Sequence, residues 1–190
     1  MPSGCFWRAK LARGIQEAPR RNERALRIEE ATLGEMHAQT ALTIMSMGAS
    51  YGEKGQSDRA IELYERALRI QEATLGEMHA DTAGTIMSMG ASYSQKGQHD
   101  RAIELYERAL RIQEATLGEM HADTAGTIMS MGATYSQKGQ HDLAIAATER
   151  ALRICLQVLG PHHPQTLQTQ ESLANARSNA ARAGSGRGRR

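Results

Sequence analysis

A block of 42 residues, repeated along the chain, is the feature that most constrains what this sequence can fold into. Residues 65–106 are identical to residues 107–148 at 37 positions and to residues 23–64 at 36 positions. A fourth and more divergent copy begins at Glu149. A fixed period of this length is typical of stacked-repeat proteins, in which each repeat buries its apolar surface against its neighbours. The sequence therefore predicts a repeat array and not a single globular domain.

Each repeat is predicted to contain two helices. A first helix is expected over 80–95 of the central copy, because four residues have the i, i+3, i+4, i+7 spacing of one helix face: Ile86, Met89, Gly90 and Tyr93. A second helix is expected over 99–116, and Gly97 is expected to end the first. A glycine inside a helix costs about 1 kcal/mol relative to alanine. We therefore expect a neighbouring helix to pass close to Gly90.

These spacings resemble the tetratricopeptide pattern of bulky-x2-Leu-Gly-x2-Tyr followed by Ala-x3-aromatic and Ala. The linkers Leu75–Thr82 (LGEMHADT) and Leu159–Thr166 (LGPHHPQT) resemble the Leu-Gly-x-x-His-Pro-Asp-Thr linker of kinesin light chain repeats. Nephrocystin-type and many bacterial repeat proteins share that linker. The resemblance covers about residues 19–176. It implies an all-α fold, a right-handed alpha-solenoid of tetratricopeptide-type helix pairs.

The period divides the chain into seven segments. We expect a poorly ordered basic leader, a partial repeat that contributes one helix, three full repeats, a capping helix and a disordered basic tail, over 1–18, 19–37, 38–79, 80–121, 122–163, 164–182 and 183–190. A polar last helix is what a solenoid needs to close its exposed end. The leader has three basic residues before position 15 and no acid there, which suits a mitochondrial transit peptide. A terminus without any targeting role is the alternative.

The composition excludes several classes of function. The two cysteines, Cys5 and Cys155, lie far apart, which predicts free thiols in a reducing, cytoplasmic compartment. No apolar run is long enough to cross a membrane. No nucleophile–base pair, phosphate loop or paired carboxylates are visible, so we predict no enzymatic activity and no cofactor. The histidines recur once per repeat at His37, His79 and His121, and this spacing separates them too far for a zinc site.

The predicted function is that of a binding module for a protein or peptide segment. In tetratricopeptide arrays, one stripe of each first helix faces the concave groove. The resemblance therefore implies these groove candidates: Met45, Met87, Met129, Gly84, Gly126, Ala91, Ala133, Ser94, Ser136, Gln95 and Gln137. Methionine adapts to varied apolar ligands, which favours a partner with apolar side chains. In the alternative interpretation, these methionines only fill space between adjacent helices.

Two other functions remain open. One is a cargo adaptor of the kinesin light chain kind, although no heptad pattern predicts the coiled coil that would join a kinesin heavy chain. The family's asparagine pair, which implies a clamp on the cargo backbone, is also replaced here by pairs such as Met87-Ser88. The other is an inert fragment of a recently expanded array, since functional grooves normally differ from repeat to repeat. The arginine-rich tail lacks interleaved aromatic residues, which argues against nucleic acid as a partner.

Overall fold

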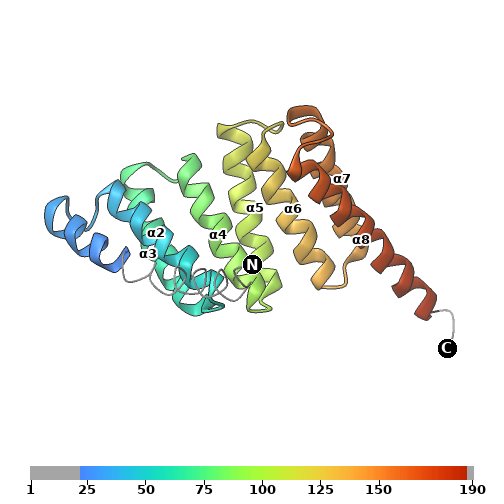
Figure 1. The fold of residues 1–190 in the computed structure, drawn as a ribbon, viewed down its shortest axis with the longest axis horizontal. Helices are drawn as coiled ribbons and strands as arrows, with labels where there is room; N and C mark the ends of the chain where they lie inside the picture. The colour runs from blue at the N-terminus through green and yellow to red at the C-terminus, as the bar shows by residue number, and fades with distance from the viewer. Residues whose placement is uncertain (1–21, 188–190) are drawn as a thin grey trace, which may run out of the picture. The chain divides into compact units, whose positions relative to one another are not determined.

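A computed structural model describes residues 22–187 (Figure 1). It contains an unlabelled helix over 22–32 followed by α2 (Ala38–Glu53), α3 (Ser57–Thr74), α4 (Ala80–Gln95), α5 (His99–Thr116), α6 (Ala122–Gln137), α7 (His141–Val158) and α8 (Pro164–Arg187). No strand occurs within these residues. The all-α class and the repeated helix pairs are therefore confirmed. The helices predicted over 80–95 and 99–116 coincide with α4 and α5.

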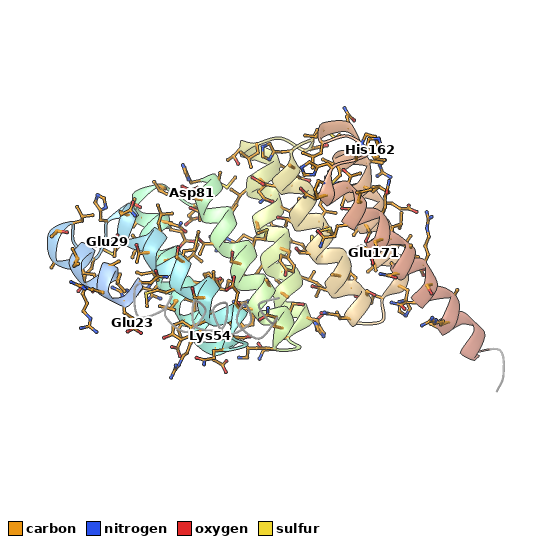
Figure 2. All side chains as sticks on the ribbon, in the orientation of Figure 1. Glu23, Glu29, Lys54, Asp81, His162 and Glu171 are labelled. Carbon is orange, nitrogen blue, oxygen red and sulfur yellow. The ribbon has the colours of Figure 1, made fainter. Side chains whose placement is uncertain are left out.

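The chain divides into two compact units, Met1–Glu77 and Met78–Arg190. In the first, the helix over 22–32, α2 and α3 share a core of buried residues, namely Leu26, Ala41, Ile44, Met47, Ala67 and Ile70. In the second, the pairs α4/α5 and α6/α7 are followed by α8, which packs on both α7 and α6. Side chains fill the spaces between the helices, and His162 projects from the loop before α8 (Figure 2). No helix of the described residues is long and apolar enough to span a membrane.

A histidine caps the start of the first helix of each repeat. Nδ1 of His79 accepts the backbone N–H of Asp81 at 3.2 Å, and Nδ1 of His121 accepts that of Asp123 at the same distance. His37 and His163 make the equivalent bond at 3.1 and 3.2 Å. A side-chain acceptor at this position satisfies one of the N–H groups that lack a partner within the helix. The recurring histidines therefore have a structural role that the sequence analysis did not assign to them.

The expected close approach at Gly90 is confirmed. A Cβ atom added to Gly90 would lie 2.9 Å from Cε1 of Tyr106, so the ring of a second-helix tyrosine lies directly on this glycine. Gly48 and Tyr64 repeat the arrangement in the first unit, at 2.8 Å. Gly97 follows α4 with a φ of 76°, in the left-handed region that glycine adopts easily, so it ends the helix as predicted.

The C-terminal part of the chain differs from our expectation. We predicted a cap that ends at 182 and a disordered tail beyond it, whereas α8 continues to Arg187. Alanine is the strongest helix former, and Ala180, Ala181 and Ala183 flank the expected end at 182 and favour continuation of the helix there. Within the cap, α8 covers Cys155 of α7, which is 1% exposed. The predicted leader over 1–18 and residues 188–190 lie outside the described residues.

Candidate functional site

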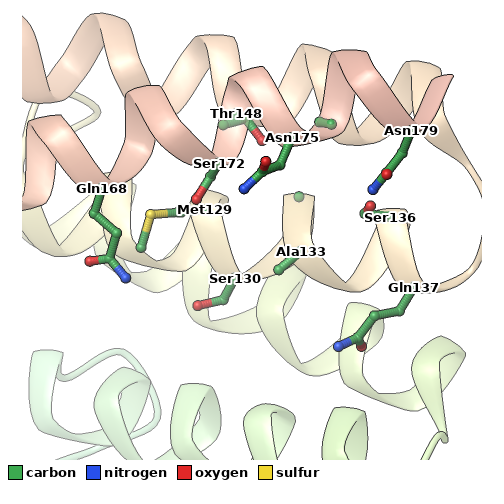
Figure 3. A pocket seen from close by; sticks show the side chains of 12 residues that line it. Met129, Ser130, Ala133, Ser136, Gln137, Thr148, Gln168, Ser172, Asn175 and Asn179 are labelled. Atoms are coloured by element: carbon green, nitrogen blue, oxygen red, sulfur yellow. The ribbon is translucent and has the colours of Figure 1, made fainter. Parts of the chain in front are cut away.

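A hollow of about 520 Å³ lies between α6 and α8, with Thr148 of α7 among its lining residues. We call it the α6–α8 pocket (Figure 3). It is lined by Met129, Ser130, Gly132, Ala133, Ser136, Gln137, Thr148, Gln168, Ser172, Asn175, Ala176 and Asn179. The stacking of successive first helices, which follows from the 42-residue period, brings α6 and α8 together here.

The wall formed by α8 is polar and uncharged. Gln168, Ser172, Asn175 and Asn179 are spaced at i, i+4, i+7 and i+11, so they form one stripe along the helix. Figure 3 shows the last three of these side chains pointing from α8 toward α6. A side-chain amide carries both donors and an acceptor, which are the groups needed to pair with a peptide main chain. This wall therefore suits an extended and uncharged peptide backbone.

The wall formed by α6 is more apolar. Met129 and Ala133 lie one helical turn apart, and Figure 3 shows Ser136 further along the same helix. The hydroxyl of Thr169 on α8 lies 3.4 Å from Sδ of Met129, so this methionine is in contact with α8 at the edge of the pocket. Methionine presents a flexible, polarisable surface that packs against many apolar shapes. The two walls together can bind a segment that has a polar main chain and apolar side chains.

Among the described residues, no charged side chain lines the α6–α8 pocket. Three basic side chains on the surrounding helices form ion pairs, Lys138 with Asp100, Arg150 with Glu114 at 2.5 Å, and Arg177 with Glu149 at 2.7 Å. A carboxylate or phosphate group would therefore find no free cation among the pocket's lining residues. Burial, with a smaller contribution from Glu107, raises the pKa of Tyr135 on α6.

The structure brings only some of the predicted groove residues to this pocket. Four of them line it: Met129, Ala133, Ser136 and Gln137. Gly126 lies on the same helix, where an added Cβ would lie 3.8 Å from Nε2 of Gln165. Met45 lies in the first unit, packed against its core.

The remaining candidates lie on α4, and some of them connect α4 to α6. The hydroxyl of Ser94 donates to Oε1 of Gln137 at 3.0 Å and lies 3.1 Å from that of Thr134. The hydroxyl of Thr127 lies 3.2 Å from Sδ of Met87, and Met87 packs against the cluster around Tyr106. A Cβ added to Gly84 would meet no atom within 4 Å. Ala91 and Gln95 lie further along the same helix, and both are exposed.

We did not predict the α8 side of the pocket, because the helix over 164–182 was expected only to cap the array. The missed lining residues are Ser130, Gly132, Thr148, Gln168, Ser172, Asn175, Ala176 and Asn179. The repeat period contained the signal. Adding 42 to Gly126, Ala133 and Gln137, three of the predicted positions, gives Gln168, Asn175 and Asn179. Among the described residues, no group of three or more His, Cys, Asp or Glu side chains could hold a metal ion.

Comparison with known proteins identifies relatives of this fold. The family model described as tetratricopeptide repeat matches residues 14–73, 81–147 and 123–182. A crystal structure of a candidate kinesin light chain from Podosopora anserina, with nearly identical tetratricopeptide-like repeats, is 27% identical, with a TM-score of 0.73; the match covers 96% of this chain and 90% of that one. A point variant of that protein gives the same identity, a TM-score of 0.76, and coverage of 92% and 82%.

A more distant structure, BtubC from P. vanneervenii, is similar in fold. It is 22% identical, with a TM-score of 0.69, and the match covers 91% of this chain and 82% of that one. No curated protein sequence matches the chain.

Proposed function

Because the chain belongs to the tetratricopeptide repeat family, whose fold is a scaffold for protein interaction, we propose that it binds an extended peptide segment of a partner protein in the α6–α8 pocket. The pocket's volume lies within the range of roughly 300–1,000 Å³ that is usual for ligand sites. The observation that carries the proposal is the pairing of an amide-bearing wall on α8 with a methionine and alanine wall on α6.

The ligand follows from these two walls. The polar stripe of α8 extends from Gln168 to Asn179, which is eleven steps along the helix or about 16 Å at a rise of 1.5 Å per residue. An extended peptide rises about 3.3 Å per residue, so about five of its residues would lie along this stripe. Their main chain would pair with Gln168, Asn175 and Asn179, and their apolar side chains would face Met129 and Ala133. The segment carries no obligatory charge, because the pocket offers no cation.

A display library of random peptides, selected on residues 19–190, tests this function. We expect it to return short segments with apolar side chains that bind with micromolar to millimolar Kd. Replacing Met87 and Met129 together with glutamate should abolish their capture while the helical circular dichroism signal is kept. Met129→Glu alone should account for most of the loss, because Met129 lines the pocket and Met87 does not.

Met120→Glu is the matched control. Met120 is 45% exposed and lies outside the pocket, so the same change there should leave peptide capture intact. If Met129→Glu unfolds the protein while Met120→Glu does not, Met129 acts as a core residue. Retention of full peptide binding by a folded Met129→Glu protein would contradict the proposed site.

Two alternatives make different predictions. A cargo adaptor of the kinesin light chain kind is supported by the Leu75–Thr82 linker and by the similarity to the Podosopora anserina structures. It would select peptides from cargo proteins, and the same display experiment can include them. An inert expanded array would select no peptide. The third copy differs from the second at Thr148, which lines the pocket, and this divergence favours a functional groove.

A further inference from the structure

A tyrosine fills the space between α4 and α6. Tyr106 of α5 is 2% exposed, and its ring lies on Gly90 of α4. It shares a buried cluster with Met131 of α6, and its hydroxyl forms a hydrogen bond with the side chain of Thr134, also on α6. Helices α4 and α6 are thus held together by a ring that a third helix inserts between them.

The next space along the array, between α6 and α8, lacks this ring. Gly132 of α6 is the equivalent of Gly90 and is unchanged, but Thr148 of α7 stands where the period places the tyrosine. Two further equivalents on α8 are smaller than their counterparts on α6: Ala176 replaces Thr134, and Asn179 replaces Gln137. Gly132, Thr148, Ala176 and Asn179 all line the α6–α8 pocket. The pocket therefore lies at the position equivalent to that of the Tyr106 ring, where this repeat has Thr148 and no aromatic side chain.

We propose that the α6–α8 pocket is a docking site for one aromatic side chain of the bound segment, which occupies the place that Tyr106 fills between α4 and α6. This inference rests on the proposed function, since it names the side chain that anchors the peptide. The surroundings suit a ring. Met87 packs against the buried cluster that contains Tyr106, and its equivalent Met129 lines the pocket. Sulfur–aromatic contacts are favourable, so Met129 suits a ring bound in the pocket.

The loss of the threonine hydroxyl sets a preference among aromatic residues. Tyr106 bonds Thr134 through its hydroxyl, whereas the side chain of the equivalent Ala176 has no group that could accept or donate a hydrogen bond. A phenylalanine ring leaves no polar atom unsatisfied at this position. The pocket should therefore bind phenylalanine at least as tightly as tyrosine. Ala176→Thr should move the preference toward tyrosine.

The first test uses the protein alone and p-cresol, which is the side chain of tyrosine, as the probe. We expect p-cresol to bind with a millimolar Kd, as is usual for a molecule of this size, and to shift the NMR signals of Met129 and Ala176. Thr148→Tyr should abolish these shifts, because the chain's own ring then fills the site. The same variant should melt at the same temperature as the wild type or higher, because it restores the packing found at Tyr106.

A control and a second variant keep this test decisive. Ala146→Tyr adds the same ring at an exposed position of α7 and should leave p-cresol binding unchanged. The double variant Thr148→Tyr with Ala176→Thr restores both members of the Tyr106–Thr134 pair, so it should fold even if the single variant does not. Lower melting temperatures in both tyrosine variants, or equal p-cresol binding by wild type and a folded tyrosine variant, would overturn the proposal. So would an absence of p-cresol binding to the wild type.

Peptides selected by display then separate the inference from the proposed function. Selected peptides should share one aromatic residue, and its change to alanine should weaken binding roughly tenfold or more, as for other buried anchor residues. If peptides bind at Met129 but show no aromatic requirement, the proposed function stands and the aromatic pocket is wrong. If no peptide binds but p-cresol does, the proposed function fails while the ring site itself is retained.

Discussion

Two glycines of α4 differ in what surrounds them, and this difference predicts opposite effects of the same substitution. Gly84→Ala should stabilise the protein by about 0.5–1 kcal/mol, because alanine is a better helix former and the added methyl group meets no atom within 4 Å. Gly90→Ala should destabilise it by about 1–3 kcal/mol, because the methyl group would collide with the buried Tyr106 ring. Urea unfolding of the two variants measures both changes. Equal effects would contradict the packing of Tyr106 on Gly90.

Tyr106 predicts a loss of stability at high pH. Burial raises the pKa of Tyr106 to about 12, whereas the unfolded chain ionises its tyrosines near pH 10. The native state therefore keeps a proton that the unfolded state loses, and ionisation favours unfolding as the pH rises from 10 to 12. Each pKa unit corresponds to about 1.4 kcal/mol, so this residue alone should contribute a loss of roughly 2–3 kcal/mol.

Tyr106→Phe is the control for this prediction. It should cost about 1 kcal/mol at neutral pH, through the lost hydrogen bond to Thr134, and should remove most of the decline between pH 10 and 12. Chemical unfolding at several pH values measures both effects. A decline that is equally steep in the two proteins would assign it to other tyrosines.

At the scale of residues, the sequence predicted the close packing at Gly90 but not the α6–α8 pocket. A glycine inside a helix points to close packing by itself, because its helix-forming cost needs compensation. The meaning of Thr148 depends on which helix its side chain faces, and that information appears only once α8 is placed beside α6. Met87 and Met129 occupy equivalent positions in the repeat, but only Met129 lines the α6–α8 pocket. The corresponding space beside Met87, between α4 and α6, is filled by the ring of Tyr106.

At the scale of elements, the histidine caps predict a matched pair of variants. His121→Ala removes the acceptor for the N–H of Asp123 at the start of α6 and should cost about 0.5–2 kcal/mol. His121→Asn supplies another side-chain acceptor that is favoured at this position and should cost less than half as much. Thermal unfolding followed by circular dichroism measures both. If asparagine is no better than alanine, the Nδ1 contact contributes nothing to stability.

Helix boundaries followed from the sequence because their signals are local. Gly97 and the apolar spacing of α4 and α5 lie within the elements that they define, and both helices begin and end where we predicted. The predicted end of α8 was wrong by five residues. We gave more weight to the glycines of the tail, which disfavour a helix, than to the alanines before them, which favour one. The capping role of His79 was missed because histidine is not among the usual capping residues.

At the scale of the whole molecule, near-identity of the repeats makes each difference between them informative. In the buried space between α5 and α6, Thr127 donates a hydrogen bond to Oε1 of Gln113 at 2.7 Å. One period later Cys155 replaces this glutamine, and its Sγ lies 3.9 Å from the hydroxyl of Thr169. A thiol is a weak hydrogen-bonding group, so this contact between α7 and α8 is weaker than the Gln113–Thr127 contact between α5 and α6. In an array where repeats contact only their neighbours, such a difference acts locally.

Because Cys155 is buried under α8, the rate at which a thiol reagent labels it reports how often α8 detaches from α7. With Cys5 changed to serine, a thiol reagent can react only during the moments when α8 has lifted away. The ratio of the labelling rate to that of the denatured protein then gives the equilibrium constant of this opening. Cooperative unfolding would make this free energy equal to the global one, whereas the weak Cys155 contact predicts a smaller value. A peptide bound between α6 and α8 should slow the labelling of Cys155. In a variant that binds no peptide, adding the peptide should leave the labelling rate unchanged.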